Sequence, residues 1–303
     1  MQSLKGHLFL YEGTGNRLVL FDDQKSLYFK YKQKHKTLFR ELQKKLIATL
    51  IQNDGDSTMI LYRKKDHFCF SILEKDFSES CLCGNGLGIM THFLLYSRQQ
   101  KNIATPVQFF SSKNKQFSVS PYKKSTFTAQ LGKVNSDPKK MHGYLASDLT
   151  RLPYHKLIEQ LNFLLQPTIG QILAICDIGK EPHLIISIPK GEQVSIHNKQ
   201  LKKIGESIML QRQIFPAGIN INFVQHAYNH TIRIATFERG VNNFTRSCGT
   251  GSVCSAFAML QTSPILHGIN RLKLKSVGGT LIIDKNNKHE YSLTTRIRFI
   301  KTL

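Results

Sequence analysis

The chain has 303 residues, of which 41% are hydrophobic, so it can bury one large core or two medium ones. No apolar stretch approaches the roughly 18 residues of a membrane span, and residues 1–7 lack the layout of a signal peptide, which predicts a soluble cytoplasmic protein. Six cysteines are too few for a disulfide scaffold of this size, and the formal net charge of +22 requires an explanation.

The first half of the chain alternates strand patterns with helix patterns. Apolar segments at residues 7–10 and 18–21 flank Gly13-Thr14-Gly15-Asn16, which predicts a hairpin. A helix is expected near Lys36–Ile51, where leucines recur on one face. Further strands are expected at Thr58–Tyr62, Phe68–Leu73, Val107–Phe110 and Phe127–Leu131.

The second half repeats this alternation after a predicted linker at Gly132–Pro138. Helices are expected near His155–Leu165 and Asn198–Leu210. Strands are expected at Gln171–Cys176, Leu184–Ile188, Ile219–Val224 and Thr231–Thr236, and a final strand after Asn287.

One short pattern occurs twice, as Cys83-Gly84-Asn85-Gly86 and as Cys248-Gly249-Thr250-Gly251. Apolar residues with helical spacing follow each copy, so both cysteines are expected at helix N-termini. The positive end of a helix favours a thiolate, and its N–H groups can hold a carboxylate. Two such ends facing each other would place one bound carboxylate between two acid/base thiols, as a two-base racemase requires.

Two other interpretations of the cysteines are less favoured than an acid/base pair. A single Cys-Gly pair is more often a buried and inert cysteine, but two copies in matching contexts favour a function. A zinc site from Cys81, Cys83, Cys248 and Cys254 is disfavoured, because its spacings differ from the usual pairs of zinc ligands.

These motifs resemble the diaminopimelate epimerase family of cofactor-independent amino-acid racemases and epimerases. That family has Cys-Gly-Asn-Gly in its first half and Glu-Arg-Gly shortly before its second Cys-Gly motif, and here the latter reads Glu238-Arg239-Gly240. Further matches in chain order are Gly13-Thr14-Gly15-Asn16, Pro182-His183, Asn220 and Gly278-Gly279-Thr280-Leu281.

The resemblance implies an α+β fold of two pseudo-symmetric α/β domains. Each domain would be a curved mixed sheet or barrel around a central helix, with the active site in the cleft between them. The first domain is expected to contain residues 1–132 and a returning segment from about 287 to 303. The second is expected to contain residues 133–286.

The resemblance also implies an isomerase that inverts the α-carbon of an amino acid without pyridoxal phosphate, another cofactor or a metal, as in lysine biosynthesis. Cys83 and Cys248 would be its catalytic pair. Glu238 and His183 would support the α-amino group or tune the thiols, and Arg239 would hold a distal carboxylate. The remaining substrate-binding residues would be Asn16, Gly84, Asn85, Asn220, Gly249 and Thr250.

Several departures from the family pattern affect the substrate. Glu74 and Glu181 occupy segments that carry neutral residues in the family, and Asn222 replaces a glycine. If both glutamates line the distal pocket, their charge favours a basic amino acid such as lysine, arginine or histidine over diaminopimelate. The alternative is that both glutamates point to solvent.

The basic surface leaves a second class of function open. Lysines gather at Lys30–Lys36, at Lys113–Lys124 and at Lys139–Lys140, and such runs can bind nucleic acid or an anionic membrane. Because the clusters are scattered, a solvated surface is the favoured interpretation, and no membrane partner is expected. A basic binding protein and an idle homologue on the same fold are the alternatives to an enzyme. The oligomeric state is left open, with a homodimer as one option.

Overall fold

The computed structural model describes Leu4, residues 6–97 and residues 103–303. The chain forms two compact units. The first contains Met1–Leu131 and Thr294–Leu303, and the second contains Gly132–Leu293. The chain therefore re-enters the first unit at Thr294, later than the return expected near Asn287.

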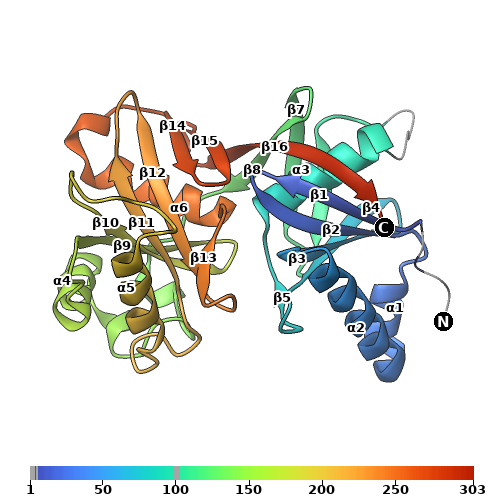
Figure 1. Ribbon diagram of the computed structural model, residues 1–303, viewed down its shortest axis with the longest axis horizontal. Helices are drawn as coiled ribbons and strands as arrows, with labels where there is room; N and C mark the ends of the chain where they lie inside the picture. The colour runs from blue at the N-terminus through green and yellow to red at the C-terminus, as the bar shows by residue number, and fades with distance from the viewer. Residues whose placement is uncertain (1–3, 5, 98–102) are drawn as a thin grey trace. The chain divides into compact units, whose positions relative to one another are not determined.

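The first unit is a mixed sheet that closes on itself. Its strands follow the order β1-β2-β3-β4-β6-β7-β8-β16, and β16 also pairs with β1, so the sheet forms a barrel. Figure 1 shows β16 as the red strand beside β1. The strands are β1 (Leu8–Gly13), β2 (Asn16–Asp23), β3 (Ser57–Lys64), β4 (His67–Leu73), β5 (Glu79–Ser80), β6 (Val107–Ser111), β7 (Gln116–Lys123), β8 (Thr126–Gly132) and β16 (Tyr291–Thr302).

The helices of the first unit occupy two different environments. Helices α1 (Leu27–Lys34) and α2 (Lys36–Gln52), blue in Figure 1, pack against each other, and together with β1 to β4 they bury an apolar cluster. Helix α3 (Gly84–His92) continues as a π-helical turn at Phe93–Ser97, and its residues 84–91 are buried. It contacts β1, β2, β3 and β7, and is therefore the central helix of the barrel.

The second unit repeats the topology of the first. Its strands follow the order β15-β14-β12-β11-β10-β9, with β13 paired to β12 as β5 is paired to β4. In each unit the second strand runs parallel to the third, and the fourth runs parallel to the strand that follows the buried helix. The strands are β9 (Gln171–Ile178), β10 (Glu181–Ser187), β11 (Asn220–His226), β12 (Thr231–Glu238), β13 (Asn243–Thr245), β14 (Arg271–Ser276) and β15 (Gly279–Lys285).

Helix α6 (Gly249–Thr262) is the counterpart of α3. It contacts β9, β10, β11, β14 and β15, and its residues 249–256 are buried. Helices α4 (Tyr154–Leu165) and α5 (Lys199–Met209) contribute to the main apolar cluster of the unit, together with side chains of β9 to β12. The two units thus confirm the predicted class of two pseudo-symmetric α+β halves, each with a central helix.

Some elements were not expected from the sequence. These are α1 and the strands β5, β7, β13, β14 and β15. None of the helices in the described ranges is long and apolar enough to cross a membrane.

Candidate functional site: two matched cysteine caps

Cys83 and Cys248 are each the N-cap of the central helix of their unit. Their backbones are nearly the same, with φ −134° and ψ 110° at Cys83 and φ −131° and ψ 116° at Cys248. Each sulfur accepts a hydrogen bond of 3.3 Å from the backbone N–H three residues later, at Gly86 and at Gly251. Both thiols are half-buried, and the first N–H groups of each helix have no acceptor within the helix.

Glycine is favoured behind both caps because the helix start lies close to other groups. A Cβ at Gly86 would overlap the Met59 side chain, and a Cβ at Gly251 would overlap the Asn222 amide oxygen. The second glycine of each motif therefore allows the helix start to approach its sheet.

In the first unit, threonine side chains hold Asn85, the residue that follows Cys83-Gly84. Thr295 donates a 2.7 Å hydrogen bond to Asn85 Oδ1, and the Thr295 hydroxyl lies 2.8 Å from that of Thr14. Asn85 also packs under the β1–β2 hairpin, where a Cβ at Gly13 would come within 2.8 Å of Asn85 Cβ. The hairpin thus fixes the orientation of Asn85.

The other predicted residues of the first unit lie at two turns. Asn16 begins β2 and pairs with Gly13 across a turn in which Thr14 and Gly15 both have positive φ. Glu74 follows β4, and its backbone pairs with Ser78 in the turn before β5. Asn16 and Glu74 are both half-buried.

In the second unit, two of the predicted residues, Thr250 and Glu238, contact the Cys248 sulfur. The Cys248 sulfur lies 3.4 Å from the Thr250 hydroxyl and is hydrogen-bonded to the Glu238 carboxylate. Thr245 donates a 2.9 Å hydrogen bond to Glu238 Oε1, which orients that carboxylate. Burial raises the pKa of the Cys248 thiol well above its usual value, and the charge of Glu238 raises it further, whereas hydrogen bonds from Thr250 and Gly251 lower it.

This result corrects the expectation that the helix N-terminus makes Cys248 a thiolate. Desolvation and the adjacent carboxylate outweigh the hydrogen bonds that stabilise the anion, so Cys248 rests as a thiol. Its proton has an acceptor in place, because Glu238 is within hydrogen-bonding reach.

Beneath the start of α6 lies a row of buried polar side chains on adjacent strands. His183 Nε2 lies 3.0 Å from the Thr250 hydroxyl, and His183 Nδ1 lies 2.9 Å from Asn222 Nδ2. Asn222 Oδ1 accepts a 2.8 Å hydrogen bond from Thr236. Burial lowers the pKa of His183 to about 3, and the charge of Arg239 contributes to the shift. His183 is therefore neutral, and both of its ring nitrogens are bound by protein groups.

Glu181, Asn220 and Arg239 form a second group in this unit. The Arg239 guanidinium donates to Glu181 Oε2 at 3.2 Å and lies 5.5 Å from the centre of the Tyr144 ring. Asn220 donates to the Pro182 carbonyl at 3.1 Å and accepts from the Arg239 backbone N–H at 3.1 Å. Asn220 thus links the backbone of β10, next to Glu181, to the backbone of Arg239 in the turn after β12.

This geometry corrects the expectations for Glu181. Its side chain is only 13% exposed and is bound to Arg239, so it neither points to solvent nor adds an uncompensated negative charge.

The sequence did not single out Asn222, Thr236, Thr295 or Tyr144 as site residues. Asn222 was noted only as a departure from the family glycine. A usable signal existed, since Asn220 and Asn222 are polar residues that alternate with Ile221 and Phe223 and so share one face of β11.

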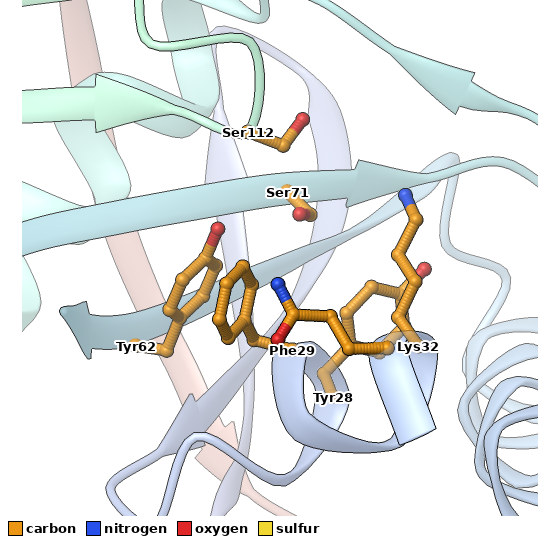
Figure 2. Close-up of a pocket in the computed structure, with 7 residues that line it drawn as sticks. Tyr28, Phe29, Lys32, Tyr62, Ser71 and Ser112 are labelled. Atoms are coloured by element: carbon orange, nitrogen blue, oxygen red, sulfur yellow. The ribbon is translucent and has the colours of Figure 1, made fainter. Parts of the chain in front are cut away.

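A cavity of about 180 Å³ in the first unit lies apart from these groups. Figure 2 shows the Phe29 and Tyr62 rings side by side in it, with centroids 5.8 Å apart. Lys32 also lines the cavity, and its ammonium is bound to Glu79 at 2.7 Å. No predicted site residue lines this cavity.

The lysines at Lys30–Lys36 lie on α1 and at the start of α2, where their side chains are exposed. Among the described residues, no three histidine, cysteine or acidic side chains gather as metal ligands would.

Comparison with known proteins relates the chain to one family. Residues 178–299 match the family model described as diaminopimelate epimerase. A diaminopimelate epimerase of Hydrogenobaculum sp. is 26% identical over 80% of this chain and 78% of its own length. That of Methanocella arvoryzae is 30% identical over 61% of this chain and 59% of its own length. That of Enterococcus faecalis is 23% identical over 73% of this chain and 62% of its own length.

Solved structures share the fold at lower identity. A phenazine biosynthesis protein of the PhzF family from Bacillus anthracis is 10% identical, with a TM-score of 0.62 over 99% of this chain and 98% of that one. A hydroxyproline epimerase from Agrobacterium vitis is 15% identical, with a TM-score of 0.59 over 97% of this chain and 90% of that one. These structures show the fold, while the family-model match and the sequence relatives confirm the resemblance to the diaminopimelate epimerase family that the cysteine motifs indicate.

Proposed function

We propose that this chain inverts the α-carbon of an amino acid by a two-base mechanism, with Cys83 and Cys248 as the two acid/base groups. The observation that carries the proposal is the matched pair of N-cap cysteines, which share backbone conformation and sulfur–amide geometry. A merely structural cysteine has no need of this geometry, and two copies with the same geometry are expected of groups that perform equivalent tasks.

The chemistry follows from what each helix start offers. The α-hydrogen of an amino acid is a weak acid, so the carbanion must be stabilised as charge spreads into its carboxylate. The N–H groups at the starts of α3 and α6 supply that stabilisation. One sulfur removes the α-hydrogen from one face while the other thiol delivers a proton to the opposite face, and the roles exchange in the reverse direction.

Glu238 sets the starting state of one half of this reaction. Because Cys248 rests as a thiol, it is ready to donate a proton, and it becomes a base only after its proton moves to Glu238. The hydrogen bonds from Gly251 and Thr250 then stabilise the thiolate. No pyridoxal phosphate, nucleotide or metal enters the proposed reaction.

Diaminopimelate is the proposed substrate because of the ion pair between Glu181 and Arg239. The distal end of diaminopimelate carries both an ammonium and a carboxylate, and the ion pair offers a partner of opposite charge to each. Lysine, arginine and histidine carry only a cation at that end, so they would interact favourably with Glu181 alone and bring no carboxylate of their own to Arg239. The names of the sequence relatives support the same choice.

The test is hydrogen exchange at the α-carbon. The purified protein is incubated in deuterated water, with EDTA and without added cofactor, with diaminopimelate and separately with each basic amino acid. We expect α-deuterium in diaminopimelate by mass spectrometry and inversion by chiral chromatography. The Cys83→Ala and Cys248→Ala variants should each lose inversion, whereas Cys81→Ala, a matched control beside the first cap, should retain it.

Two results would overturn the proposal. Near-normal inversion in either cap variant would rule out the two-base assignment. Exchange in a basic amino acid but not in diaminopimelate would reject the substrate and leave the reaction type standing.

A further inference from the structure

In the buried row beneath α6, the hydrogen bonds all run from donor to acceptor in one direction. This direction follows from the hydrogen bond that Thr236 donates. Thr236 donates its hydroxyl proton to Asn222 Oδ1 at 2.8 Å. Asn222 therefore presents its amide N–H to His183 Nδ1, which lies 2.9 Å away. Since Nδ1 accepts this bond, the single proton of the neutral imidazole must reside on Nε2.

The same direction continues toward the sulfur. His183 Nε2–H donates to the Thr250 hydroxyl at 3.0 Å, so the proton of that hydroxyl is available to another acceptor. The Cys248 sulfur lies 3.4 Å from the Thr250 oxygen and accepts that proton. With the Gly251 N–H, the sulfur then has two donors, while its own proton is shared with Glu238.

We infer that Asn222 is a positioning residue which holds His183 in the Nε2–H tautomer and thereby directs the Thr250 hydroxyl to the Cys248 sulfur. The inference rests on the proposed function for its effect on catalysis. The hydrogen-bond direction itself depends only on the second unit.

Burial makes this arrangement persistent. Asn222 and His183 are fully buried, and the exposed fraction of Thr236 is 3%. An unsatisfied polar atom at such a depth costs free energy, so each group keeps its partner. Asn222 also faces Thr236 directly across the β11–β12 pair, which fixes its side chain independently of α6.

The position is distinctive in this chain because Asn222 stands where the family pattern has glycine. A glycine offers no side chain to bind Nδ1, so the ring would be free to carry its proton on either nitrogen. Asn222 replaces that freedom with a fixed tautomer, and its amide oxygen contacts Gly251 at the start of α6.

The test reads the tautomer directly. The protein is labelled with ¹⁵N-histidine, and the ring nitrogens of His183, assigned with a His183→Gln variant, are observed by long-range ¹H–¹⁵N NMR. In the wild type we expect the shifts of a neutral ring protonated at Nε2. In Asn222→Asp, which has nearly the same shape but can only accept at this position, we expect the proton at Nδ1 or a doubly protonated ring.

A matched control lies on the same strand. Gln225 is buried and uses its amide to bind Pro189 and Glu192, with no link to His183. Gln225→Ala should leave the His183 ring signals unchanged. Asn222→Gly supplies a second variant should the aspartate prevent folding, and we expect its ring signals to become a mixture of both tautomers.

Kinetics then connect the tautomer to the reaction. Asn222→Asp should lower kcat by about tenfold or more with KM changed by less than about threefold, because Asn222 is fully buried beneath the start of α6. A wild-type ring protonated at Nδ1, or an unchanged tautomer in Asn222→Asp, would overturn the inference even in an active enzyme. A wild type that exchanges no amino acid would instead contradict the proposed function and leave the tautomer result intact.

Discussion

The Glu181 carboxylate and the Arg239 guanidinium form an ion pair, with 3.2 Å between Oε2 and Nη2, in which both side chains are largely shielded from water. Neither residue brings a net charge to its surroundings, so the pair suits a substrate end that carries both signs. Removing one partner should therefore change the preferred substrate.

The first prediction concerns Arg239→Gln. This variant loses the group that is proposed to bind a distal carboxylate, and it breaks the ion pair with Glu181. A hydrogen bond to a charged group contributes about 1.5–3 kcal/mol, so kcat/KM for diaminopimelate should fall by about 10- to 100-fold. Activity on lysine, relative to diaminopimelate, should rise. Arg271→Gln, which breaks the exposed pair with Asp284, is the control and should not alter the ratio.

The second prediction concerns the charge beside Cys248. In Glu238→Gln, the negative charge that raises the pKa of the thiol is absent, so that pKa should fall. The rate of Cys248 alkylation by iodoacetamide, followed against pH by peptide mass spectrometry, should rise at a lower pH than in the wild type. Glu206→Gln on the exposed face of α5 should leave the curve in place. An upward shift in Glu238→Gln would contradict the assigned role of the carboxylate.

The third prediction concerns acid stability. The pKa of His183 is about 3 in the folded state and about 6.5 in an unfolded chain. Between these values the unfolded chain binds a proton that the folded state does not. The resulting stability is therefore complete above about pH 6.5 and is lost as the pH falls toward 3, with about 2 kcal/mol lost by pH 5.

The measurement is urea unfolding of wild type and His183→Gln at neutral pH and at about pH 5. The difference between their unfolding free energies should shrink by about 2 kcal/mol at the lower pH. The same comparison with His155→Gln, an exposed site on α4, should show no such change. If the unfolding free energies of the wild type and of His183→Gln change by the same amount with pH, the His183 ring is not held neutral in the folded state.

The fourth prediction concerns the contact between α6 and β11. A Cβ at Gly251 overlaps the Asn222 amide oxygen, which Thr236 holds in place. Gly251→Ala should destabilise the second unit by about 1–3 kcal/mol. In an Asn222→Gly background the overlap disappears, so the same substitution should cost less. Additive effects in this double-mutant cycle would show that the two residues are not in contact.

The fifth prediction concerns the basic helices. Arg40 lies four residues from Lys36 and from Lys44 on α2, so each pair repels. Arg40→Glu replaces both repulsions with attractions and should raise the unfolding free energy by about 0.5–1 kcal/mol at low salt, with the gain reduced at about 0.5 M NaCl. The nucleic-acid alternative is examined with the same variant. If a labelled DNA duplex binds this surface, its affinity should fall steeply as the salt concentration rises. It should also bind the Arg40→Glu variant more weakly than the wild type.

Much of the fold could be predicted because periodicity and turn residues agree in most elements. Helix α2 and strands β3 and β4 fall within one or two residues of the expected bounds. Helix α1 was missed because its lysines resemble a solvated charge run, and Tyr28 is its one buried residue. Strand β14 has the alternation Arg271-Leu272-Lys273-Leu274, which is a pattern typical of a half-buried strand.

The candidate site was less predictable because its contacts are long-range. Each cysteine cap is formed by consecutive residues, so both caps could be predicted from the sequence. The partners of Cys248 come from β12 and from the start of α6. Behind them, only folding brings His183, Asn222 and Thr236 from β10, β11 and β12 into one row. The thiolate expectation for Cys248 was wrong for the same reason, since burial and the position of Glu238 are properties of the folded unit.

Strand β16 has a consequence for the order in which the chain folds during synthesis. The barrel of the first unit needs β16 to join β8 to β1, and Thr295 on that strand also holds Asn85 beside the first cysteine. The ribosome makes β16 only after all of β9 to β15. Until then the edges of β1 and β8 lack their partner strand, and during this interval they are the sites at which the unfinished first unit can pair with other chains.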